Sequence, residues 1–139
     1  DYIGSIVNPT NVKGFYGMLD IPFGETFSLM AKGQFLEAID TVTAANMVKK
    51  DKLTQAYGAI AWNFSPKNTF DVSYEYVKYD PTTAGLRNIE EEYWTFGIGH
   101  KMGDNANLKV GYQLVDYKGS AATADYRSGI GVVQLGVSF

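Results

Sequence analysis

The stretch GIGVVQLGVSF, residues 129–139, decides the fold. Steps of two along it place apolar side chains on one face of an extended chain, at Val133, Leu135, Val137 and Phe139. The residues between them, Gln134 among them, are polar or small. This alternation predicts a β-strand between two different environments. A strand that ends on an aromatic residue beside a free carboxylate fits a closed barrel, which has no exposed sheet edge.

The same alternation recurs along most of the chain. We predict strands at residues 12–22, 26–37, 52–64, 69–80, 91–102, 107–118 and 126–139, and a weaker first run at 1–7. Between 38 and 51 the pattern changes, because Leu36, Ile39 and Val42 recur every three residues and two alanines with Met47 favour a helix. A short helix within a long loop is therefore predicted there.

The predicted connections also alternate in length. They are tight at 23–25, 65–68 and 103–106 and long at 38–51 and 81–90. Up-and-down strands of about ten residues, with short turns at one end and longer loops at the other, are typical of outer-membrane barrels. We therefore expect an all-β, antiparallel up-and-down transmembrane β-barrel. Residues 1–139 would supply one domain of seven or eight strands, the C-terminal portion of a larger barrel.

Composition narrows the function classes. Charged residues make up 19% of the chain, below the roughly 25% of soluble domains, whereas aromatic residues reach 14%. A net charge of −3 and a pI near 5.0 argue against nucleic acid as a partner, because phosphate binding needs a basic patch. No cysteine is present, which excludes disulfides and thiolate metal sites. The mean hydropathy of −0.15 does not argue against a membrane barrel, because only alternate strand residues face lipid.

Aromatic residues gather near the predicted strand ends. Those beside the short turns are predicted to form an interfacial girdle: Phe23, Trp62, Phe64, Phe70 and Phe139. Tyr93 and Trp94 are predicted to belong to the girdle at the opposite interface.

On these runs and on the terminal residues Val133, Leu135, Val137 and Phe139, the chain resembles the C-terminal part of a bacterial outer-membrane porin. The likeness covers nearly the whole chain as a pattern. It implies a location in the bacterial cell outer membrane, surrounded by lipid, and a homo-oligomer, namely a trimer. It also implies that the terminal strand is the signal read by the barrel assembly machinery. The expected function is a water-filled channel for passive diffusion of ions and small hydrophilic solutes, without a cofactor.

If the aromatic face meets lipid, the opposite face lines the channel. The predicted pore-lining residues are Lys32, Gln34, Asp71, Ser73, Glu75, Lys101, Lys109, Gln113 and Gln134. Charges in such positions set ion preference, and the mixed signs predict weak selectivity.

Two other function classes stay open. A complete eight-stranded barrel would serve anchoring, adhesion or envelope stability, but residues 1–7 would then have to pair fully with the last strand. A soluble lipocalin-like carrier would bind a small apolar ligand inside, but its outer face should be densely charged.

No catalytic or metal site is predicted, and the chain is not expected to be an enzyme. The sequence offers no cluster of Ser, His and acid at the long-loop end. His100, the only histidine, is assigned a structural role at the interface. The acidic run Glu90-Glu91-Glu92 beside Asp80 could bind a divalent cation or meet lipopolysaccharide, but a solvated loop is the preferred interpretation.

Overall fold

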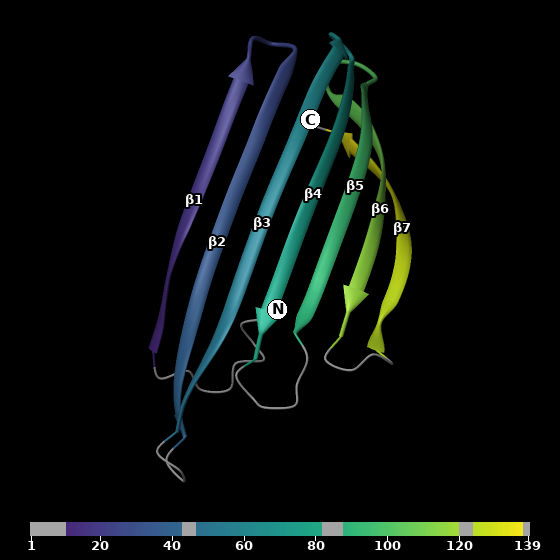
Figure 1. The fold of residues 1–139 in the computed structure, drawn as a ribbon. Helices are drawn as coiled ribbons and strands as arrows, with labels where there is room; N and C mark the ends of the chain where they lie inside the picture. Colours follow the sequence, from purple (N-terminus) through teal and green to yellow (C-terminus); the bar gives the residue numbers. More distant parts are fainter. Residues whose placement is uncertain (1–10, 43–46, 82–87, 120–123, 138–139) are drawn as a thin grey trace.

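A computed structural model describes residues 11–42, 47–81, 88–119 and 124–137. They form one all-antiparallel sheet of seven strands, which follow one another in chain order (Figure 1). The strands are β1 (Asn11–Phe23), β2 (Phe27–Val42), β3 (Met47–Ser65), β4 (Asn68–Asp80), β5 (Ile89–Lys101), β6 (Ala106–Lys118) and β7 (Tyr126–Val137). The predicted up-and-down strand order is confirmed.

Three short turns lie together at one end of the sheet, at the top of Figure 1. The β1–β2 turn contains Gly24, whose φ of 64° is a backbone conformation that glycine adopts without a steric penalty. Asn63 of β3 donates two hydrogen bonds to this turn. Its backbone N–H donates to Thr26 O, and its side-chain Nδ2 donates to Glu25 O. These contacts fix the β1–β2 hairpin against its neighbour.

The structure corrects the prediction for residues 38–51. Strand β2 continues to Val42 and β3 begins at Met47, with an unbroken register from Ala38↔Asp51 to Val42↔Met47. The predicted helix is therefore wrong, because these residues pair as a hairpin that extends beyond the other strands (Figure 1). Residues 43–46 of that connection lie outside the described residues.

The register sorts the strand residues onto two faces. One face carries the odd-numbered residues of β1, β2 and β7 and the even-numbered residues of β3 to β6, and we call it the apolar face. The other is called the polar face. On the five interior strands, every large apolar side chain that the structure shows exposed lies on the apolar face. On the polar face such side chains occur only on the edge strands β1 and β7.

The polar face is the crowded one. Leu53, Val77 and Tyr79 form a buried cluster at the end away from the short turns, with Leu36 and Ile89 packed against it. Val115 and Glu91 are also buried on this face, at 7% and 6% exposure. A sheet that curves towards one side crowds the side chains there, and Figure 1 shows β5, β6 and β7 curving round.

Within the described residues, β1 pairs only with β2 and β7 only with β6, so the sheet is open and not closed into a barrel. The predicted strand at residues 1–7 and the terminal Phe139 lie outside the described residues. A closed, larger barrel therefore stays a prediction.

Candidate functional site

The nine residues predicted to line a channel come from five strands and lie on one side of the sheet. Following the register, they all share the polar face: Lys32 and Gln34 on β2, Asp71, Ser73 and Glu75 on β4, Lys101 on β5, Lys109 and Gln113 on β6, and Gln134 on β7. Their common face is a finding about the sheet. Their contact with a channel stays a prediction.

An ion pair on the polar face spans a whole strand. Lys109 Nζ of β6 lies 2.9 Å from Asp71 Oδ1 of β4, although β5 runs between them. The bridge passes over β5 at Gly97 and Gly99, which oppose Asp71 and Lys109 in the register. A Cβ at Gly97 would lie 2.5 Å from the Asp71 carboxylate. The missing side chain at Gly97 therefore makes room for this contact.

We expect Gly97→Ala to break the Asp71–Lys109 pair, because the new methyl group would occupy the position of the carboxylate. The freed ammonium should react with a water-soluble acetylating reagent about two- to fivefold faster, the range that an exposed ion pair supports. Peptide mass spectrometry of Lys109 measures this rate. Gly99→Ala is the control, since a Cβ there meets only Thr69 Cβ at 3.8 Å. Equal rates in the two variants would contradict the assigned role of Gly97.

Nearer the middle of the polar face, side chains link adjacent strands. The Lys32 ammonium lies 4.4 Å from the centre of the Tyr57 ring, a cation–π contact between β2 and β3. The Gln55 amide donates to Glu75, joining β3 to β4. Together these contacts hold charged and amide groups in a row across the sheet.

A further amide link lies between β5 and β6, where Gln113 Nε2 donates to Thr95 Oγ1 at 3.1 Å. The partners in these three links were absent from the predicted set: Gln55, Tyr57 and Thr95. The signal for them was available, because each falls on the same alternating phase as the predicted residues of its neighbouring strand.

The acidic run at 90–92 is not a solvated loop, so that interpretation is wrong. All three residues belong to β5, and the alternation separates them. Glu90 and Glu92 lie on the apolar face, whereas Glu91 is buried on the polar face and accepts a hydrogen bond from the Tyr93 hydroxyl. In the described part of the chain, no three His, Cys, Asp or Glu residues are placed to hold a metal ion.

The apolar face has an aromatic border beside the short turns. Phe23 and Phe27 have ring centres 5.9 Å apart, and Trp62 and Phe64 have theirs at 5.5 Å. These positions match the predicted girdle of that end, with Phe70 directly opposite Trp62. The girdle at the opposite interface stays a prediction for Trp94. This residue lies on the apolar face near the middle of β5, where its ring centre is 4.7 Å from that of Tyr74.

Tyr93 does not share the face of Trp94. It belongs to the polar face, where it packs against the buried cluster and donates to Glu91. Its predicted place in the second girdle is therefore wrong, because consecutive strand residues point to opposite sides. His100 is on the apolar face beside the short turns, and its Nδ1 lies 2.6 Å from Asn68 Oδ1.

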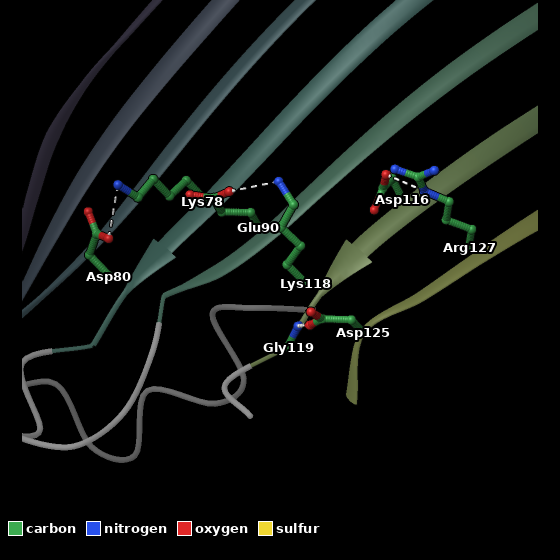
Figure 2. Close-up of polar contacts among 8 residues, drawn as sticks. All are labelled: Lys78, Asp80, Glu90, Asp116, Lys118, Gly119, Asp125 and Arg127. Atoms are coloured by element: carbon green, nitrogen blue, oxygen red, sulfur yellow. Dashed lines mark hydrogen bonds and ion pairs between the residues drawn. The ribbon is translucent and has the colours of Figure 1, made fainter. Parts of the chain in front are cut away.

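Away from the short turns, the apolar face ends in a belt of ion-paired residues. In the described residues the belt pairs are Lys13–Glu37 at 3.6 Å, Lys78–Asp80 at 3.3 Å, Lys118–Glu90 at 3.4 Å and Arg127–Asp116 at 2.7 Å. Figure 2 shows the last three on β4 to β7, with Gly119 N–H donating to Asp125 just beyond β6. Each pair joins one basic and one acidic side chain, so the paired residues of the belt are together neutral.

The belt runs obliquely to the register. The row that starts at Arg127 on β7 continues through Asp116 and Glu92 and reaches Gly17 on β1. The charged residue of β1, Lys13, lies four positions beyond Gly17. Strands that are tilted relative to a plane cross it at positions that shift steadily from one strand to the next in the register, as in a barrel.

The three described residues of the predicted assembly signal lie on the apolar face of β7. Val133, Leu135 and Val137 are exposed there, Val133 at 72%. Phe139 lies outside the described residues, and recognition of this strand by assembly machinery stays a prediction.

In the comparisons with known proteins, no family model, no curated protein and no solved structure matches this chain. Within the described part of the chain, no helix has the length and hydrophobicity that a membrane span requires.

Proposed function

We propose that this chain forms part of the wall of a water-filled channel in a bacterial outer membrane, of the porin kind, which passes ions and small hydrophilic solutes by diffusion. The observation that carries the proposal is the division of the sheet into two faces. Exposed apolar side chains of the interior strands occupy one face, and polar side chains linked across strands occupy the middle of the other. A wall between lipid and water needs this division.

The dimensions of the apolar face support a membrane location. Its uncharged stretch runs from Phe15 to Phe23 on β1 and from Phe27 to Phe35 on β2. A tilted strand needs about 9–11 residues to cross the hydrocarbon, and both stretches reach the lower end of that range. Aromatic residues border the stretch at one end and the charged belt borders it at the other. Headgroups and water would meet both borders.

The open edges of β1 and β7 support a larger barrel, because unpaired strand edges in lipid would leave backbone groups without partners. Further strands, and the trimer expected of a porin, would complete the wall. A lipocalin-like carrier fits less well, since it would turn its large apolar side chains to the crowded face, and the interior strands expose theirs on the opposite one.

The test is conductance of the full-length protein in planar lipid bilayers. We expect stepwise increases in current. Lys32→Glu and Lys109→Glu should each raise the permeability of potassium relative to chloride, by about two- to tenfold, because lining charges change local ion concentrations. The reversal potential in a potassium chloride gradient measures this ratio.

Lys13→Glu is the matched control, since it makes the same charge change on the apolar face. Its reversal potential should equal that of the unmodified protein. Absence of stepwise current would contradict the channel. Equal shifts in all three variants would contradict the assignment of the polar face to the lumen.

A further inference from the structure

A hollow of about 270 Å³ opens on the polar face between β5 and β7. The side chains that matter in its lining are Thr95, Lys109, Gln113, Ile130, Val132 and Gln134. Gly111 contributes no side chain and deepens the floor. A strand added to the edge of β7 would lie beside the sheet and not over this face, so the hollow would stay open in a larger barrel.

The lining combines one cation with neutral donors. Lys109 is the only ionisable group on the polar face within the hollow, and its side chain is 52% exposed. Its ammonium has three protons, and the 2.9 Å contact with Asp71 across β5 uses one of them. The amides of Gln113 and Gln134 are further donors in the same lining, where Gln113 gives one of its two amide protons to Thr95. Such a set favours a carboxylate, which accepts several hydrogen bonds and is attracted by the charge.

Apart from Tyr112, the remaining wall is aliphatic. Ile130 and Val132, both about half exposed, come from β7 and face the same hollow. They would contact a short hydrocarbon chain attached to the carboxylate. A space of 270 Å³ is below the range of about 300–1,000 Å³ that drug-sized ligands occupy, so the ligand is small.

We propose that this hollow is a binding site for short-chain aliphatic monocarboxylates in the channel wall. Lys109 binds the carboxylate, Gln113 and Gln134 orient it, and Ile130 and Val132 contact the aliphatic chain. Asp71 competes with the ligand for the Lys109 ammonium. This site rests on the proposed function, because it assumes that monocarboxylates pass through the channel and are retained briefly at the wall.

The first experiment uses butyrate and the full-length protein in detergent, with saturation-transfer NMR as the readout of binding. The unmodified protein should show saturable transfer to butyrate, and Lys109→Gln should lose it. Asp71→Asn should tighten binding about two- to fivefold, since it removes the competing exposed ion pair. Lys32→Gln, which removes a lysine from the same face outside the hollow, should leave binding unchanged.

A further variant tests the aliphatic wall. Val132→Thr keeps the side-chain shape but replaces one methyl group with a hydroxyl, so it should weaken the binding of butyrate more than that of acetate. Absence of saturable transfer in the unmodified protein, or equal weakening by Lys109→Gln and Lys32→Gln, would overturn the site.

The channel is tested separately by adding butyrate to potassium chloride in the bilayer. A saturable fall in chloride current that Lys109→Gln removes supports the site. Stepwise current with no effect of butyrate overturns the site but leaves the channel standing. Binding in detergent without any stepwise current keeps the site and contradicts the channel.

Discussion

Replacing Val110 with arginine should destabilise the protein in lipid by about 2–4 kcal/mol, the cost of a positive charge near the bilayer midplane if the apolar face meets lipid as proposed. Val110 lies in the middle of the apolar face of β6, between Leu108 and Tyr112, and is 49% exposed. Its neighbours across the strands are Ile98 and Val133, so the guanidinium would find no partner among them.

The measurement is urea unfolding of protein refolded into lipid vesicles, followed by heat-modifiable mobility on gels. Gln113→Arg is the matched control, because it introduces the same side chain three residues away on the polar face. We expect that control to lower the free energy of unfolding by only about 0.5–1.5 kcal/mol, the net contribution of the hydrogen bond to Thr95 that it removes. Equal destabilisation by the two variants would show that the apolar face does not meet lipid.

The strands themselves could be predicted from the sequence because a sheet with two unlike faces imposes a period of two on side-chain polarity. The alternation in β2 predicted the two faces correctly. The register places Phe27, Leu29 and Ala31 on one face, and it places Ser28 and Lys32 on the other. Because one face is polar, a slip of one residue would reverse every assignment, so the pattern also constrains the register.

The same reasoning failed for residues 38–51. Alanine and methionine exceed other residues in helix propensity by only a few tenths of a kcal/mol each, so propensity decides little once pairing partners are present. The paired backbones from Ala38↔Asp51 to Val42↔Met47 extend a ladder that is already in register. Tertiary pairing thus outweighed a local preference.

The contacts of the candidate site could not be predicted, because a sequence gives the face of a residue but not its neighbours. Asp71 and Lys109 belong to strands that are not adjacent. Their side chains form an ion pair because Gly97, between them, has no side chain. Burial of Glu91 likewise depends on the curvature of the sheet, which alternation does not encode. Register and curvature are properties of the whole sheet.

Leu53→Ala should lower the free energy of unfolding by about 2–3 kcal/mol, the lower part of the range for a buried leucine. Leu53 is 7% exposed and packs in the buried cluster with Val77 and Tyr79 at the end of the polar face away from the short turns. Removing its side chain beyond Cβ leaves a cavity that strand backbones cannot close, because each is fixed by the ladders on both sides.

The matched variant is Leu53→Met, which keeps the volume and should cost less than about 1.5 kcal/mol. Urea unfolding of both proteins in the same vesicles measures the difference. If the two variants lose the same stability, the cluster does not stabilise the sheet by close packing.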